Sequence, residues 1–111
     1  MKNGDIWLVS FTPSQGHEYK NDRPALIIQS NSTLAKTSLV TIIPLTSNLE
    51  KRMQDDVIVE KSSKNRLFVT SVAKVNCISS FDRSRFKKKI GEIEEEILEE
   101  IKNYLKIHFS L

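Results

Sequence analysis

The chain has 111 residues, of which 39% are hydrophobic and 28% are charged, and its formal net charge is +3. This length supports one modest core, so we expect a single domain over residues 1–111, with oligomerisation as added support. The single cysteine, Cys77, excludes an intrachain disulfide and a zinc site made of several thiolates, and we expect it to be a small core residue. No apolar run approaches the roughly 18 residues needed to cross a bilayer, so we expect a cytoplasmic protein without membrane contact.

Charge is distributed unevenly along the chain. Residues 1–91 hold 15 Lys and Arg against 8 Asp and Glu, whereas residues 92–111 hold 2 against 6. A basic body of this kind fits a polyanionic partner. Small domains also carry such asymmetry for solubility alone, so composition leaves both explanations open.

Two apolar runs near the N-terminus predict the first two strands, over residues 6–11 and 25–29. The polar segment between them, residues 16–24, carries His17, Glu18 and Arg23. Connections longer than about twelve residues in a compact domain are usually functional or disordered, because exposed backbone gains little burial to offset its ordering entropy. We therefore interpret this segment as a long hairpin connection with a functional role.

The middle of the chain predicts further strands, after a short helical turn around Leu34. β-branched residues predict a strand over residues 39–45, in which Pro44 marks an edge or end, and a hydroxyl-bearing turn follows at residues 46–48. The other strand-like segments are residues 56–60, 66–70 and 71–78, with a bulge or break near Ser71.

The last third of the chain contains a basic segment followed by a predicted amphipathic helix. Residues 79–91 form a basic segment that predicts a turn and a short final strand, fitting either a nucleic-acid backbone or a solvated edge strand protected by lysines. From Glu92 to His108, apolar residues recur every three or four positions, which predicts an amphipathic helix of about four turns. The sequence thus predicts a mainly β fold of the α+β type: an antiparallel sheet of six or seven strands with one long C-terminal helix.

Several kinds of site are disfavoured by the residues available. With 3 glycines in the chain, a phosphate-cradling glycine loop is not expected. The two histidines and the scattered acidic residues lack the spacing of metal ligands, so we expect neither a metal site nor a cofactor.

Residues 4–9, Pro13, 16–18 and 23–28 form an N-terminal signature, and residues 44–47, 81–85 and 90–93 continue it in order. Their resemblance is to the MazF/PemK (Kid) family of toxin endoribonucleases. It implies an SH3-like barrel of antiparallel strands with a C-terminal helix, and a homodimer. It also implies ribosome-independent, metal-free, sequence-specific cleavage of single-stranded mRNA by the toxin of a type II toxin–antitoxin system. The implied partner is an antitoxin whose flexible tail occupies the RNA groove.

Metal-free RNA cleavage requires a base for the ribose 2′-hydroxyl, donors for the pentavalent phosphorane and an acid for the leaving 5′-oxygen. Arg23 suits the second role because a guanidinium is always charged and offers forked donors. Thr46 is the family-matched hydroxyl that would orient the phosphate, with Ser47 as a helper. Either His17 or Glu18 would transfer the proton, and the sequence does not choose between them. The structural alternatives are a turn cap for His17, a salt bridge from Glu18 to Arg23, and an ordinary strand end at Thr46.

Further polar residues are expected to contact RNA. They are Lys20, Ser47, Lys51, Arg52, Lys74, Asn76, Arg83 and Arg85. Kid-like members carry an arginine and an aspartate where this chain has Lys74 and Asn76, so the positive charge is kept but the carboxylate is not. Because an asparagine transfers no proton, this departure assigns proton transfer to His17 and Glu18.

The alternative function is a non-catalytic binding domain on the same fold, either an inhibitor of a protein target, as the related toxin CcdB is, or an RNA binder. The pairing of Arg23 with Thr46 favours cleavage, because a protein-binding module has no need of a phosphate-matched pair. Exposed apolar residues at the end of the C-terminal helix would favour the binding domain.

Overall fold

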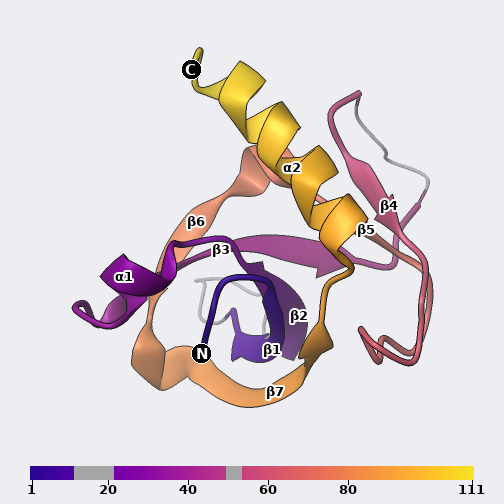
Figure 1. Cartoon of the computed structure of the whole chain (residues 1–111). Helices are drawn as coiled ribbons and strands as arrows, with labels where there is room; N and C mark the ends of the chain where they lie inside the picture. The colour runs from indigo at the N-terminus through magenta and orange to yellow at the C-terminus, as the bar shows by residue number, and fades with distance from the viewer. Residues whose placement is uncertain (12–21, 50–53) are drawn as a thin grey trace.

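In a computed structural model, one antiparallel sheet and a C-terminal helix account for most of the chain (Figure 1). The structure describes residues 1–11, 22–49 and 54–111. The strands are β1 (Asp5–Ser10), β2 (Asp22–Ile27), β3 (Leu39–Thr46), β4 (Val57–Val59), β5 (Ser71–Ala73), β6 (Ser79–Asp82) and β7 (Phe86–Glu92). The helical segments are α1 (Asn31–Leu34), the 3-10 turns η1 (Val75–Cys77) and η2 (Arg83–Arg85), and α2 (Glu95–His108). The predicted fold class, mainly β with a long C-terminal helix, is confirmed.

The sheet is organised around β3. The strand order is β4-β5-β3-β2-β1-β7, and β6 pairs with β3 outside this path. The first half of β3 pairs with β6, its last two residues pair with β5, and β2 lies along its other side. β1 and β2 pair antiparallel, as predicted for a hairpin. Figure 1 shows the strands curving around the core, as in the SH3-like barrel that the sequence predicts.

Alternation along the strands buries two apolar clusters. In β2, Leu26 belongs to the cluster that α2 covers, whereas Ala25 and Ile27 belong to the cluster on the opposite face. Ile101 of α2 is fully buried in the first cluster, as the predicted helical periodicity requires. Trp7 and Phe86 pack edge to face at the margin of the second cluster. Burial of a large aliphatic side chain contributes about 1.5–3 kcal/mol, so these clusters are the main source of stability.

A turn at residues 62–67, called here the Asn65 turn, lies between β4 and β5 in the chain. Its side-chain hydrogen bonds reach the start of α2. The Asn65 side chain is fully buried, accepts bonds from the backbone N–H groups of Ser62 and Leu67, and donates to the carbonyl of Glu60 and the carboxylate of Glu94. The turn also packs tightly against β7. A Cβ added at Gly91 would lie 2.3 Å from the carbonyl oxygen of Asn65, so only glycine fits there.

Three of the predicted strands are wrong. Residues 66–70 form no strand, because Arg66 takes a positive φ of 58° and the Asn65 side chain supplies bonds that a strand ladder would otherwise provide. The predicted strand 71–78 is limited to β5, after which η1 turns the chain. The short final strand predicted in residues 79–91 is instead two strands, β6 and β7, separated by η2.

Three other local predictions need correction. Asp22, Arg23 and Pro24 belong to β2 and not to the connection before it. Pro44 lies inside β3, where its missing N–H is tolerated because it falls between the residues paired with β6 and those paired with β5. Cys77 is exposed and not a core residue, since η1 directs Val75 into the core in its place.

Lys2, Asp5, Lys89 and Glu92 form an ion cluster between the N-terminus and β7. Lys89 Nζ donates to Glu92 Oε2 at 2.8 Å, and Lys2 Nζ donates to the same oxygen at 3.1 Å. These bonds lower the pKa of Glu92 from its ordinary value of 4.5 to about 2. Lys89 also lies 3.4 Å from the nearly buried carboxylate of Asp5, so the cluster ties the first residues to the last strand.

The substitution Glu92→Gln should change how stability depends on acidity. Because the folded state depresses the pKa of Glu92, its ionised form stabilises the fold above about pH 4.5, and this contribution is lost as the pH falls toward about 2. We expect the melting temperatures of wild type and Glu92→Gln to differ at neutral pH and to converge across this range. The exposed Glu99 offers a control, since Glu99→Gln should follow the wild-type curve. A difference between wild type and Glu92→Gln that stays constant down to about pH 2 would contradict the assignment.

Candidate active site

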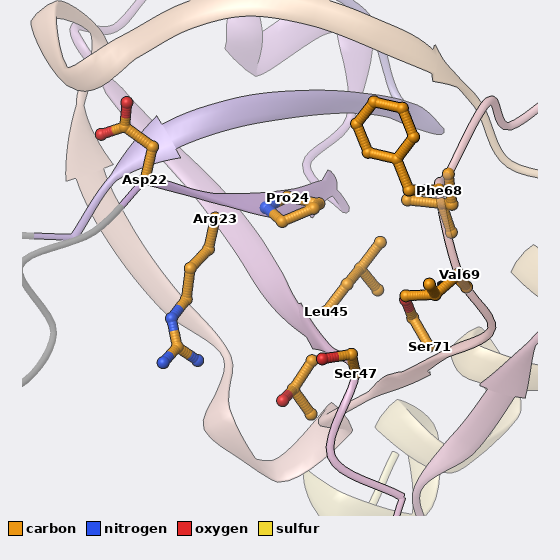
Figure 2. A pocket seen from close by; sticks show the side chains of 10 residues that line it. Asp22, Arg23, Pro24, Leu45, Ser47, Phe68, Val69 and Ser71 are labelled. Carbon is orange, nitrogen blue, oxygen red and sulfur yellow. Dashed lines mark hydrogen bonds between the residues drawn. The ribbon is translucent and has the colours of Figure 1, made fainter.

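A cleft of about 320 Å³ opens where the start of β2 meets the end of β3 (Figure 2). The residues that line it are Asp22, Arg23, Pro24, Leu45, Thr46, Ser47, Leu67, Phe68, Val69 and Ser71. Three residues predicted from the sequence, Arg23, Thr46 and Ser47, are thus brought together although more than twenty positions separate the first from the others.

Strand register explains how Arg23 reaches Thr46. β2 and β3 run antiparallel with Ala25 opposite Pro44, so the first residues of β2 lie beside the last residues of β3. Continuing this register by two residues places Arg23 across from Thr46. Figure 2 shows the side chains of Arg23 and Ser47 at the cleft, and Phe68 above Leu45 on the other part of its lining.

The polar part of the cleft combines a cation with hydroxyl groups. The Arg23 side chain is half-buried, and its guanidinium carries a permanent positive charge. The Thr46 hydroxyl accepts a bond from the backbone N–H of Asn48 at 3.2 Å, which orients it and leaves its proton able to donate. Donors of these two kinds, side by side, are suited to the oxygens of a phosphate group.

The apolar part of the cleft includes residues that the sequence interpretation missed. Leu67, Phe68 and Val69 were assigned to a strand, yet only Leu67 is buried, and Phe68 is 94% exposed. The available signal was their run of three consecutive apolar residues, because alternation in a half-buried strand buries only every second side chain. Phe68 thus belongs to the cleft and not to the core.

Four of the predicted RNA contacts lie away from the cleft lining. Lys74 Nζ is 2.7 Å from Asp56 Oδ2 in an ion pair whose carboxylate side chain is fully buried. Arg83 donates to the backbone carbonyls of Leu34 at 2.6 Å and Thr37 at 2.9 Å, so it holds the segment after α1.

Arg85 and Asn76 complete this group of four. The guanidinium of Arg85 lies 5.4 Å from the ring centre of Phe81, and Asn76 is exposed on η1. Neither side chain lines the cleft, so their contact with RNA stays a prediction.

Five other predicted residues lie outside the described residues. They are His17, Glu18, Lys20, Lys51 and Arg52. The assignment of proton transfer to His17 or Glu18 therefore stays a prediction, as do the three basic contacts.

A second recess, of about 380 Å³, lies on the far side of the Asn65 turn and has Lys64, Arg66 and Lys89 in its lining. Lys89 is engaged by Glu92 and Asp5 there. Of the residues predicted from the sequence to act in catalysis or bind RNA, none that the structure describes lines this recess.

The described residues form neither a metal-binding cluster nor a membrane-spanning helix. Residues 1–11, 22–49 and 54–111 contain no cluster of three or more His, Cys, Asp or Glu side chains arranged to hold a metal ion. Among the helices of the same ranges, none is long and apolar enough to cross a membrane.

The fold and the cleft together define a small antiparallel barrel with an arginine-and-hydroxyl site suited to a phosphate group. The chain belongs to the family of PemK-like, MazF-like toxins of type II toxin–antitoxin systems, which matches residues 2–109. The family resemblance stated from the sequence is confirmed.

Individual relatives match this chain along its full length. The protein named endoribonuclease MazF9 from Mycobacterium tuberculosis is 29% identical over 116 residues, covering 100% of this chain and 98% of that protein. The crystal structure of MazF from Deinococcus radiodurans has a TM-score of 0.81 at 27% identity and covers 100% of this chain and 97% of its own. The same fold recurs at 18% identity and a TM-score of 0.79, covering 100% and 96%, in a mycobacterial endoribonuclease solved in complex with its cognate antitoxin.

Proposed function

We propose that this protein is the toxin of a type II toxin–antitoxin system and cleaves single-stranded RNA, especially mRNA, as a metal-free, ribosome-independent and sequence-specific endoribonuclease. The observation that carries the proposal is the pairing of Arg23 with Thr46 in one cleft of a MazF-like fold. A relative that matches over the whole chain is named an endoribonuclease, which supports the same activity here.

The reaction follows from the groups available. The ribose 2′-oxygen attacks the adjacent phosphorus, a bond from that oxygen to phosphorus forms, and the bond from phosphorus to the 5′-oxygen breaks. Arg23 donates to the non-bridging oxygens of the pentavalent phosphorane, where negative charge develops. The Thr46 hydroxyl orients the phosphate, with Ser47 beside it.

Proton transfer completes this step. A base takes the proton of the 2′-hydroxyl, and an acid returns a proton to the leaving 5′-oxygen. We assign these transfers to His17 and Glu18, because the amide of Asn76 neither gives up nor takes up a proton near neutral pH. The products are a 2′,3′-cyclic phosphate and a 5′-hydroxyl.

The partners follow from the same cleft. An antitoxin segment carrying carboxylates would compete with RNA for Arg23, and the mycobacterial endoribonuclease of the same fold was solved with its cognate antitoxin. We further propose a cytoplasmic homodimer of one domain per chain, residues 1–111, with Lys20, Lys51 and Arg52 extending the RNA contacts.

A second candidate function, binding without cleavage, is favoured by one observation. The end of α2 and the residues after it expose apolar side chains, with Ile107 73% exposed and Leu111 89% exposed. A surface of this kind fits a protein partner. It fits an antitoxin or a second copy equally well, whereas the cleft with Arg23 and Thr46 supports the nuclease.

The test is to incubate the purified protein with a long unstructured RNA in excess EDTA and to map the fragment ends. We expect discrete cuts that leave 2′,3′-cyclic phosphate or 3′-phosphate ends, and weaker cutting by Thr46→Val, which keeps the shape of the side chain but removes its hydroxyl. Equal cutting by both preparations would point to a contaminating nuclease or a wrong role for Thr46. RNA that is bound but stays intact would support the binding domain instead.

A further inference from the structure

We propose that Phe68 is a stacking platform for one base of the bound RNA, next to the phosphate site formed by Arg23 and Thr46. This inference rests on the proposed function and names a positioning residue for it. Its ligand is an unpaired nucleobase of either purine or pyrimidine type, since every base offers a π-face.

The exposure of Phe68 has no explanation in the fold. Its side chain is 94% exposed, whereas Phe11, Phe81 and Phe86 pack against the second apolar cluster. A phenylalanine gains stability only when it leaves water, so a ring held in solvent contributes almost nothing to folding. An aromatic ring in this position is available for a ligand.

Phe68 is also presented from a firmly held segment. On one side, the backbone N–H of Leu67 donates to Asn65 Oδ1 at 3.1 Å, and the Leu67 side chain is buried. On the other side, the Ser71 hydroxyl donates to the carbonyl of Val69 at 3.1 Å, where β5 begins. The ring is thereby positioned by short connections at both ends, which lowers the entropy cost of stacking a base on it.

The residues around Phe68 suit a nucleotide better than a purely apolar ligand. The same cleft holds the phosphate donors Arg23 and Thr46 and the apolar residues Pro24 and Leu45. A nucleotide likewise joins an anionic phosphate to a flat, stackable base. Unpaired RNA bases are commonly bound by stacking on aromatic side chains. With the base on Phe68 and the phosphate at Arg23 and Thr46, the RNA would be held on both sides of a ribose. RNA is therefore favoured over a protein partner as the occupant.

The experiment measures binding by fluorescence anisotropy with a short oligoribonucleotide that carries one 2′-deoxy residue at the mapped cut, or at each position in turn if no cut is found. In a series of such oligonucleotides, each base in turn is replaced by an abasic residue, so that every phosphate is kept. Wild type is compared with Phe68→Ala and Phe68→Trp, and with Phe109→Ala as a control for an exposed phenylalanine outside the cleft.

We expect Phe68→Ala to weaken binding roughly 5- to 150-fold, while Phe68→Trp and Phe109→Ala bind as wild type or tighter. One abasic position should weaken binding to wild type by a similar factor and cause no further loss in Phe68→Ala. This coupling at a single position would establish stacking.

Phe68→Ala binding equal to wild type, or abasic losses that are the same in both proteins, would overturn the inference. A change in oligomeric state without coupling to any base would also overturn it and would assign Phe68 to contact with a second copy. The proposed function fails separately: coupling without cleavage of unmodified RNA would keep the stacking site and reject the nuclease. Cleavage without coupling would keep the nuclease and reject the stacking site. If no RNA bound at all, both the stacking site and the nuclease would be rejected.

Discussion

Arg23→Ala is expected to lower the rate of RNA cleavage about 10²–10³-fold while leaving the fold intact. The physical reason is that removing one donor aimed at developing charge in a closed site typically costs this factor. Arg23 is half-buried and lines the cleft with Thr46, where the proposed mechanism has its guanidinium donate to the phosphorane oxygens. The measurement is the single-turnover cleavage rate of an oligoribonucleotide in excess EDTA, with a thermal melt of each variant beside it.

Two matched variants sharpen this prediction. Arg23→Lys keeps the charge but loses the forked donors, so its rate should fall between those of wild type and Arg23→Ala. Lys36→Ala removes an exposed cation that neither lines the cleft nor belongs to the predicted RNA contacts, and it should retain most of the activity. If Arg23→Ala and Lys36→Ala lost activity equally, the effect would come from general attraction of RNA and not from a role at the phosphate.

Lys74→Met is expected to lower the free energy of unfolding by about 3–5 kcal/mol. Its ammonium group is 2.7 Å from Asp56 Oδ2, and the side-chain exposures are 20% for Lys74 and 0% for Asp56. Removing the lysine takes a positive charge away from a fully buried carboxylate, whereas methionine keeps much of the side-chain volume. Urea denaturation gives the change directly.

Other substitutions separate this role from RNA contact. Lys87→Met breaks an exposed pair with Asp22, at 3.5 Å, and should cost less than about 1 kcal/mol. Replacing both partners, with Lys74→Met and Asp56→Leu together, should recover much of the loss, because neither charge of the pair remains. A Lys74→Met protein with wild-type stability and weakened RNA binding would instead favour the RNA contact that the sequence predicts for Lys74.

Much of the candidate site could be predicted because its signals are local. The β-branched run before Pro44 and the apolar run after Arg23 identify β3 and β2, and antiparallel pairing of the two brings Arg23 beside Thr46. The periodicity from Glu92 onward likewise identifies α2. In each case, the hydrophobic pattern repeats within a single strand or helix. Neighbouring residues in the sequence are therefore enough to predict that element.

The parts that could not be predicted depend on interactions that a local pattern does not reveal. The ion pair of Lys74 is one of them, because nothing near it in the sequence indicates Asp56, eighteen positions earlier. Residues 66–70 looked like a strand because neither the left-handed backbone at Arg66 nor the bonds from Asn65 can be read from composition. Phe68 was assigned to a strand for the same reason, although it lies at the site.

The contact between Gly91 and the carbonyl of Asn65 links β7 to the cleft, although no described residue of β7 lines the cleft. Any side chain at position 91 must push the Asn65 turn outward, since the nearest backbone oxygen would lie 2.3 Å from the new carbon. That turn leads directly into Leu67 and Phe68, which form the rim of the cleft. The absence of a side chain on Gly91 therefore helps to hold the Asn65 turn, and with it Leu67 and Phe68, in place beside the cleft.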